Sequence, residues 1–189
     1  MQHGSTDERW MKRLRVIGWS IVAGLLLLPA VAMQFTPDVD WSIGDLIFAA
    51  VLLIGTGILA ELLVRRSRNA AYRWGAALAL GALLLLVWSN AAVGFVGSGA
   101  NVANVLYAAL AGVIVVWSLA VRFKAKGMAL GMFATAIAQA LITALAFATH
   151  LVRAEETFII PAINAFFIVV WTAAALLFRK ADRQAPHGQ

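Results

Sequence analysis

The chain contains no cysteine and few residues that carry protons or bind metals. Its 189 residues include only three His and nine Asp or Glu, and charged residues make up 13%. Without cysteine there can be no disulfides, thiolate metal sites, cysteine nucleophiles or thiolate-bound haem and iron–sulfur clusters. His3 and His187 lie near the chain ends, which leaves His150 alone and disfavours bis-histidine haem and multi-His metal sites. The sequence therefore predicts no cofactor and no bound metal.

Apolar residues dominate the composition instead. They make up 62% of the chain, and the mean hydropathy is +0.86, both well above the values of an ordinary soluble domain. This predicts a polytopic membrane protein whose immediate partner is the lipid bilayer. The net charge of +6 would suggest nucleic acid in a soluble protein. Here the basic residues lie at the ends of apolar segments, so no nucleic-acid partner is expected.

Six segments are long enough to cross a bilayer, which takes about 20 apolar residues. They are Val16 to Phe35, Ile43 to Val64, Trp74 to Val96, Val102 to Val121, Gly127 to Thr149, and Thr157 to Phe178. Because the connections are short, sequential segments should be antiparallel neighbours. The predicted fold is an all-α membrane protein with six transmembrane helices in three antiparallel hairpins. Residues 16–178 form this domain, between a basic N-terminal segment, 1–15, and a C-terminal tail, 179–189.

Basic residues predict the orientation of these helices. Fourteen of the fifteen Lys and Arg fall in four clusters, and Arg153 alone lies outside them. The clusters are Arg9, Lys12, Arg13 and Arg15; Arg65, Arg66, Arg68 and Arg73; Arg122, Lys124 and Lys126; and Arg179, Lys180 and Arg183. Basic residues near the ends of spans are retained on the cytoplasmic side. Both termini are therefore expected in the cytoplasm.

Two features of the sequence leave alternatives open. The first span has a Leu25 to Leu28 core, Pro29 and the small-x-small run Ala30 to Ala32, as in a secretory signal. Its apolar run is longer than a signal core of about 7–15 residues, which favours a retained span over cleavage to a five-span protein. Spans two, four and six also end alike, with Arg65, Arg122 and Arg179 spaced 57 residues apart. A common bilayer thickness is the preferred explanation, and a triplication is the alternative.

Neutral polar residues in the spans form the candidate site. At about 1.5 Å per residue, six of them should share a depth in the outer third of the membrane. They are Asn90, Asn101, Asn104, Gln139, Thr143 and Asn164. Amides both donate and accept hydrogen bonds. The predicted layer therefore either binds a small polar ligand or joins the helices to one another.

Glycine-containing segments border this layer. Gly94, Gly97 and Gly99 lie between spans three and four and indicate either a tight exposed turn or, less readily, a segment that dips into the membrane. Span five carries small and polar residues at four-residue intervals, from Gly127 and Gly131 to Thr143. Helices in membranes associate through such residues, so span five should be the most buried helix. The alternative is a homodimer face.

Ionisable groups are scarce inside the spans. Glu61 lies near the cytoplasmic end of span two, four residues before Arg65. This spacing favours an interfacial ion pair over a proton-handling carboxylate.

Motifs along most of the chain are similar to those of a known family. They are Leu28-Pro29 to Gln34-Phe35, Trp41 to Asp45, Trp88 to Gly94, Gly97-Ser98, Asn101 to Asn104, Tyr107, and Arg122-Phe123 to Gly127-Met128. On these residues the chain resembles a family of small bacterial inner-membrane proteins without an assigned function. The resemblance implies a bacterial inner-membrane location and no reaction. Members often carry two acidic residues where this chain has Gly99 and Ala100, and Pro where it has Val102, so properties that depend on those carboxylates are in doubt here.

Catalysis would require acids, bases or nucleophiles that converge at one depth of the membrane, and the sequence offers no such set. We therefore expect no enzyme. The leading prediction is a non-catalytic membrane module or accessory subunit, with a homo-oligomer or a membrane-protein partner. The alternative is a channel or carrier for a small neutral solute through an outer cavity lined by Asn, Gln and Thr.

Overall fold

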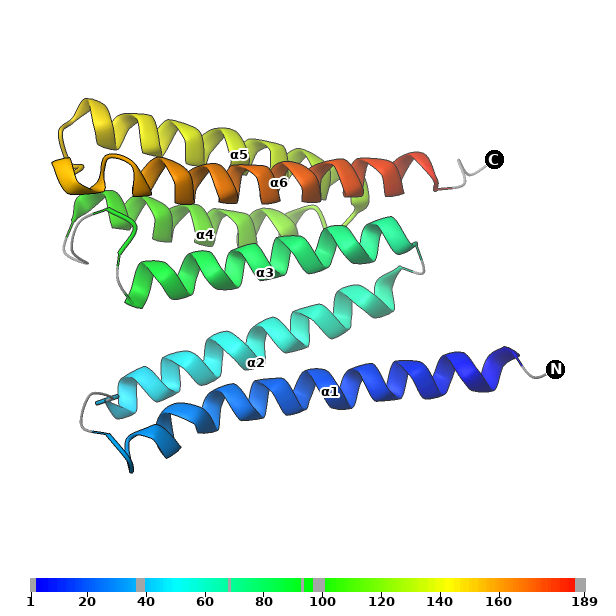
Figure 1. The fold of residues 1–189 in the computed structure, drawn as a ribbon. Coiled ribbons are helices and arrows are strands. Elements are labelled where there is room, and N and C mark those ends of the chain that lie inside the picture. The colour runs from blue at the N-terminus through cyan, green and yellow to red at the C-terminus, as the bar shows by residue number, and fades with distance from the viewer. Residues whose placement is uncertain (1–2, 37–39, 68, 93, 97–100, 186–189) are drawn as a thin grey trace. The chain divides into compact units, whose positions relative to one another are not determined.

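The computed structural model describes residues 3–36, 40–67, 69–92, 94–96 and 101–185. Its helices are α1 (His3–Ala32), α2 (Ile43–Arg66), α3 (Ala70–Ala92), α4 (Val102–Ala120), α5 (Ala125–Ala148), the short 3-10 helix η1 (Ala154–Glu156) and α6 (Ile159–Arg183). All six α-helices are long and apolar enough to cross a membrane (Figure 1). The predicted all-α fold with six membrane-length helices is confirmed.

Several helix boundaries differ from the predicted spans. Helix α1 begins at His3, so most of the basic segment 1–15 continues the first helix. Helix α6 runs to Arg183, past the predicted end at Phe178. Helix α3 ends at Ala92 rather than Val96. Hydropathy finds the apolar part of a helix, and a helix continues beyond it wherever charged residues extend into the headgroup region.

The chain divides into two compact units, residues 1–62 and 63–189. In the first unit, the guanidinium of Arg15 on α1 lies 2.6 Å from the carboxylate of Glu61 on α2. The indole of Trp19 lies within van der Waals reach of Gly57, where an added Cβ would be 3.5 Å from the ring. Helix α2 begins with a capping box, because the backbone N–H of Asp45 donates to Ser42 Oγ and that of Ser42 donates to Asp45 Oδ2. Asp45 therefore caps span two.

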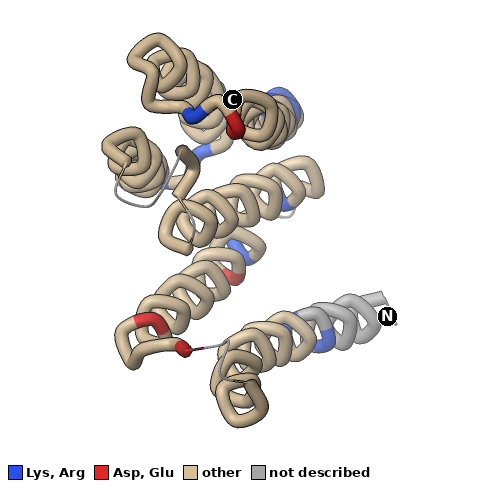
Figure 2. The backbone as a smooth tube through the Cα atoms, turned by 60° about the vertical axis from the view of Figure 1, so that its left-hand side comes forward, with Lys and Arg blue, Asp and Glu red and all other residues tan. Residues whose placement is uncertain are grey.

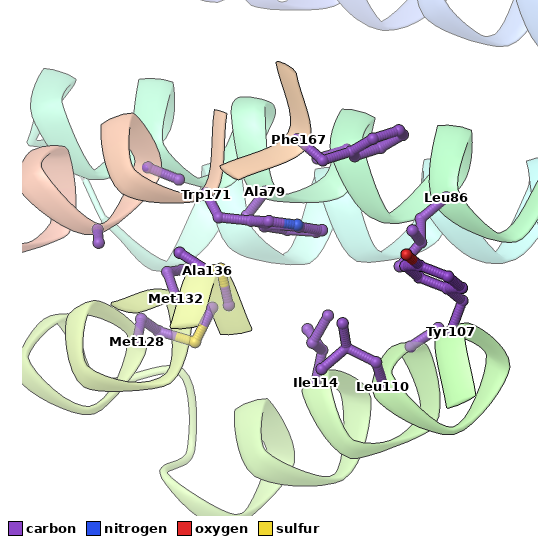
Figure 3. Close-up of a cluster of buried hydrophobic side chains, with 14 of the residues drawn as sticks. Ala79, Leu86, Tyr107, Leu110, Ile114, Met128, Met132, Ala136, Phe167 and Trp171 are labelled. Carbon is purple, nitrogen blue, oxygen red and sulfur yellow. The ribbon is translucent and has the colours of Figure 1, made fainter. Parts of the chain in front are cut away.

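The second unit contains helices α3 to α6. Helix α5 packs against α4 and α6, and α3 packs against α4 and α6. All four helices contribute side chains to one apolar cluster, in which Trp171 and Phe178 of α6 are fully buried (Figure 3). Close approach depends on small residues, since a Cβ at Gly75 would lie 3.3 Å from the carbonyl oxygen of Ala174.

The small-residue stripe of α5 lies inside this unit. Gly131, Thr135 and Gln139 are buried, and a Cβ at Gly131 would lie only 2.4 Å from the indole of Trp117 on α4. The stripe is thus occupied within the chain rather than open to a second copy. Helix α5 is nevertheless not the most buried, because 33% of its span is buried against 39% for α4. That expectation was wrong, since the face of α5 with Ile137 and Leu141 is exposed.

Charged residues concentrate near the ends of the helices. Figure 2 shows long uncharged stretches between the Lys and Arg residues and the Asp and Glu residues. In the second unit, Tyr72 near the start of α3 donates to the carbonyl oxygen of Phe123 in the α4–α5 turn at 2.7 Å. Asn69 donates to Gln184 Oε1, just beyond α6, at 3.1 Å. The start of α3, the α4–α5 turn and the end of α6 therefore meet at one end of this unit.

Candidate polar site in the second unit

Gln139 is the centre of a buried hydrogen-bonded group between α5 and α6. Its side chain has no solvent-exposed area. Gln139 Oε1 accepts from the indole N–H of Trp171 at 2.8 Å, and Nε2 donates to Asn164 Oδ1 at 3.1 Å. Asn164 Nδ2 in turn donates to the carbonyl oxygen of Ile160 in its own helix at 3.0 Å. Both ends of both amides are in use.

The chemistry of the partners determines how these amides are oriented. An indole N–H can only donate, so the oxygen of Gln139 must face Trp171. The nitrogen of Gln139 then faces Asn164 and requires an acceptor there, which leaves the nitrogen of Asn164 for a carbonyl. The chain Trp171 to Gln139 to Asn164 to Ile160 satisfies each donor with an acceptor in one consistent direction.

A hydroxyl pair extends this group to α4. Thr143 Oγ1 donates to the backbone carbonyl of Gln139 at 2.8 Å, so its remaining capacity is as an acceptor. The hydroxyl of Tyr107 lies 3.2 Å from Thr143 Oγ1 and therefore acts as the donor. Tyr107 is fully buried. Three of the four helices of the unit thus contribute to one polar cluster.

Asn104 organises a second group at the start of α4. Its Oδ1 accepts from the backbone N–H groups of Phe95 and Val96 at 2.7 and 3.0 Å, and its Nδ2 donates to the carbonyl oxygen of Val96 at 3.2 Å. The side-chain amide of Asn104 therefore bonds backbone groups of Phe95 and Val96 that would bond to other backbone groups if α3 continued. This explains why α3 does not reach Val96, and it buries Phe95 and Val96, which we expected at the end of span three. Residues 97–100 of the predicted turn lie outside the described part of the chain.

Asn90 is attached to this second group by one end only. Its Nδ2 donates to the backbone carbonyl of Asn104 at 3.0 Å. A carbonyl oxygen cannot donate, so the amide cannot be turned around. Asn90 Oδ1 is then a buried acceptor that has no hydrogen-bond partner among the described residues. Among the six predicted site residues, Asn90 is the one whose side-chain nitrogen makes a hydrogen bond in these contacts while its oxygen makes none.

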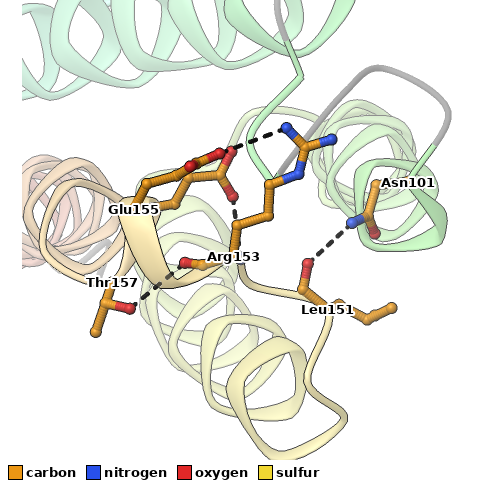
Figure 4. Close-up of polar contacts among 6 residues, drawn as sticks. Asn101, Leu151, Arg153, Glu155 and Thr157 are labelled. Carbon is orange, nitrogen blue, oxygen red and sulfur yellow. Dashed lines mark hydrogen bonds and ion pairs between the residues drawn. The ribbon is translucent and has the colours of Figure 1, made fainter.

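Asn101 caps α4 and ties it to the α5–α6 connection. Its Oδ1 accepts from the backbone N–H of Ala103 at 2.9 Å, and its Nδ2 donates to the carbonyl oxygen of Leu151 at 3.1 Å (Figure 4). Beside it, Arg153 lies 3.7 Å from the carboxylate of Glu155. Asn101 therefore has a structural role as a helix cap and a cross-link.

Glu61 pairs with a residue that the sequence did not suggest. Its carboxylate contacts Arg15 of α1, and the two side chains are 26% and 47% exposed, respectively. The predicted pairing with Arg65 stays a prediction. Because both partners are partly exposed, the contact with Arg15 contributes little beyond positioning, at most about 1 kcal/mol.

One groove of the second unit lies away from the polar groups. It has a volume of about 440 Å³ and runs along an exposed face of α4. It is lined by Ala109, Gly112, Val113, Val116, Trp117 and Ala120. These residues are apolar and include none of the six predicted site residues. The groove is therefore not the predicted cavity lined by Asn, Gln and Thr.

Sequence reasoning missed two members of the polar cluster. Trp171 lies seven residues after Asn164, and Tyr107 lies three residues after Asn104, so each shares a helix face with a predicted residue. That spacing was the available signal. Trp and Tyr bury large apolar surfaces but need a hydrogen-bond partner for their polar atom, and the neighbouring amides could have indicated one.

The described side chains offer hydrogen bonding but no converging reactive groups. Within residues 13–185, excluding the gaps, no cluster of three His, Asp or Glu could hold a metal ion. The amides of Gln139 and Asn164 do not transfer protons readily, and the hydroxyl of Thr143 donates to the Gln139 carbonyl rather than to a base that would activate it. Comparison of the chain with protein-family models, curated proteins and solved structures returned no match. Function must therefore be argued from these contacts.

Proposed function

We propose that the chain is a non-catalytic membrane module whose polar side chains hold its helices together. The observation that supports this most directly is the Gln139 group, in which each amide atom already has a partner inside the bundle. A ligand would have to displace those bonds. Between membrane helices, such contacts are the usual means of association, because lipid tails offer no hydrophobic driving force.

The proposed topology has three antiparallel hairpins, with both termini in the cytoplasm of a bacterial inner membrane. The four basic clusters support this orientation, because they alternate with apolar segments along the chain. The contacts of Tyr72 with Phe123 and of Asn69 with Gln184 also support it, because they join the start of α3, the α4–α5 turn and the end of α6 at one end of the second unit. Each of these three regions is basic.

As a module without its own reaction, the protein should act through another copy or another membrane protein. Native mass spectrometry after gentle extraction from its own membrane tests this. We expect a retained second polypeptide, or a second copy of the chain. The bare chain alone, with no protein partner at any detergent concentration tried, would contradict the accessory-subunit role. A retained small molecule would instead support a binding function.

One observation favours a second function, the binding or conduction of a small neutral solute. Asn90 Oδ1 is a buried acceptor without a partner among the described residues, and such an atom costs about 1–3 kcal/mol unless a donor reaches it. A solute that carries a hydroxyl or an amide N–H would supply that donor. The same atom would then mark the solute position beside Asn104.

Leucine substitutions at Asn90 and Asn164 distinguish the two functions. For the packing role, Asn164→Leu should lower stability by about 1–3 kcal/mol because it strands the Gln139 amide, whereas Asn90→Leu should cost less or stabilise. Liposomes that contain the unchanged protein should take up glycerol and urea no faster than empty liposomes, as measured by light scattering.

The opposite pattern would support the conduit. Uptake of glycerol or urea by the unchanged protein, lost in a well-folded Asn90→Leu variant, would contradict a packing role for Asn90. Asn101→Leu is the matched control, because its amide is used at both ends in a cap and a cross-link. It should lower stability without a specific effect on flux.

A further inference from the structure

Two basic clusters of the second unit are held side by side by one tyrosine. Tyr72 is only 4% exposed, and its hydroxyl donates to the carbonyl oxygen of Phe123. The ring of Tyr72 also contacts the ring of Phe178 edge-on, with centroids 5.2 Å apart. Phe123 lies between Arg122 and Lys124, and Phe178 directly precedes Arg179 in the chain. One buried side chain therefore contacts the α4–α5 turn and the last turns of α6.

The result is a surface with a strong excess of positive charge, which we call the basic patch. Its members are exposed and come from these two regions: Arg122, Lys124, Lys126, Arg179, Lys180 and Arg183. Among the described residues of α3 to α6 and their connections, the acids are Asp182, beside the patch, and Glu155 and Glu156, in the α5–α6 connection. Asp182 therefore neutralises at most one of six charges. Like charges within about 8–10 Å repel at physiological salt unless anions gather there.

Helix dipoles explain only part of the patch. Lys180 and Arg183 lie in the last turn of α6, where a cation is favoured. Lys124 and Lys126 lie at the first turn of α5, where a cation is disfavoured and where no acidic residue is present. The dipole of α5 therefore does not account for the positive charge of the α4–α5 turn.

Apolar residues next to the patch indicate the depth at which it lies. Leu119 precedes Arg122 by less than one turn, and Leu176 precedes Arg179 in the same way; both side chains are exposed. On helices of membrane length, exposed leucines face lipid tails, and the basic side chains that follow reach the headgroup region. The patch therefore meets the bilayer at the height of the lipid phosphates.

We propose that the basic patch binds anionic phospholipid headgroups. Charge complementarity and depth together select a lipid rather than a soluble polyanion, because the adjoining surface is apolar and suits acyl chains. Each Lys or Arg near a membrane surface strengthens the attraction to anionic lipid about fivefold. Six such residues on one rigid end of the bundle should give a clear preference for anionic over zwitterionic lipid.

Native mass spectrometry of the full chain in detergent, titrated with phosphatidylglycerol or phosphatidylcholine, tests the proposal. We expect tighter binding of phosphatidylglycerol. Lys124→Gln should weaken that binding about fivefold, and the triple change Arg122→Gln, Lys124→Gln and Lys126→Gln should weaken it roughly 10- to 100-fold. Arg153→Gln is the matched single control, because Arg153 is exposed but lies in the α5–α6 connection. It should leave binding unchanged.

Orientation must be checked, because basic residues also direct topology. The chain has no cysteine, so a single Ala185→Cys reporter, at an exposed residue just beyond α6, shows by labelling from either side whether a variant inserts as the unchanged protein does. Equal affinity for both lipids, no effect of Lys124→Gln, or an equal effect of Arg153→Gln would overturn the proposal. Displacement of phosphatidylglycerol by millimolar inorganic phosphate would also overturn it, since the site would then be one for free phosphate.

Discussion

Replacing Gln139 with Met should lower the free energy of unfolding by about 2–4 kcal/mol, as measured by reversible unfolding of the purified protein in mixed micelles. The two side chains are close in volume, so packing changes little. The change removes the acceptor of the Trp171 indole N–H and the Gln139 donor of Asn164 Oδ1. Both side chains are fully buried. A buried group left without a partner costs about 1–3 kcal/mol.

The size of this loss of stability shows whether the cost is that of two average hydrogen bonds or that of two buried groups left without Gln139. Hydrogen bonds between membrane helices contribute about 0.6 kcal/mol each on average, because the separated helices find other partners. Two lost bonds alone would therefore cost little more than about 1 kcal/mol. The larger value is expected because Trp171 and Asn164 stay buried inside the bundle, where water does not reach the atoms that Gln139 contacts.

Thr135→Val is the matched control on the same helix. Thr135 is also buried, but its hydroxyl donates to the Gly131 carbonyl one turn earlier in its own helix. Removing it strands no side chain of another helix, so the cost should stay below about 1 kcal/mol. A smaller loss for Gln139→Met than for Thr135→Val would show that the amide group does not hold α5 and α6 together.

Sequence alone predicted the number and approximate positions of the helices, because the bilayer demands long apolar segments whatever their packing. It failed where a side chain decides the boundary. Nothing in the hydropathy of Phe95 and Val96 distinguishes them from the end of span three. Their backbone N–H groups leave the helix because Asn104 offers a substitute acceptor from the next helix. That contact depends on tertiary structure.

The polar layer was predicted as a set of residues but not as pairs. Helix periodicity gives the face on which Gln139, Thr143 and Asn164 lie, yet it leaves open how far each helix is rotated and shifted against its neighbour. Those two quantities decide that Gln139 meets Asn164 and Trp171 on α6 while Asn90 meets Asn104. The same limit explains Glu61, whose observed partner Arg15 lies on another helix.

Replacing Gly127 with Ala should lower the free energy of unfolding by about 2–3 kcal/mol, although Ala is the better helix former by about 1 kcal/mol. The added Cβ would lie 2.5 Å from Val121 Cβ, a non-bonded separation that Cβ atoms in proteins essentially never show. Rotation of the Val121 side chain cannot relieve this contact, because its Cβ is attached to the backbone. Either the start of α5 or the end of α4 must move.

The α4–α5 turn has little freedom to absorb that movement. Arg122 and Phe123 both adopt positive φ, 52° and 54°, which is already unfavourable for residues with side chains. The turn is also held by Tyr72 through Phe123 and by the indole of Trp117, which donates to the Gly127 carbonyl at 3.0 Å. Overpacking of this kind costs about 1–3 kcal/mol or more where the surroundings are rigid.

Changes at Val121 show which of its atoms causes the loss of stability in Gly127→Ala. Gly81→Ala is the control, because nothing lies within 4 Å of an added Cβ there, and it should stabilise by up to about 1 kcal/mol. Combining Gly127→Ala with Val121→Ala should give no rescue, since alanine keeps the offending Cβ. Val121→Gly removes that atom and should recover most of the loss beyond its own cost. Equal rescue by both changes at Val121 would show instead that the methyl groups of Val121, and not its backbone position, limit how closely α4 and α5 approach.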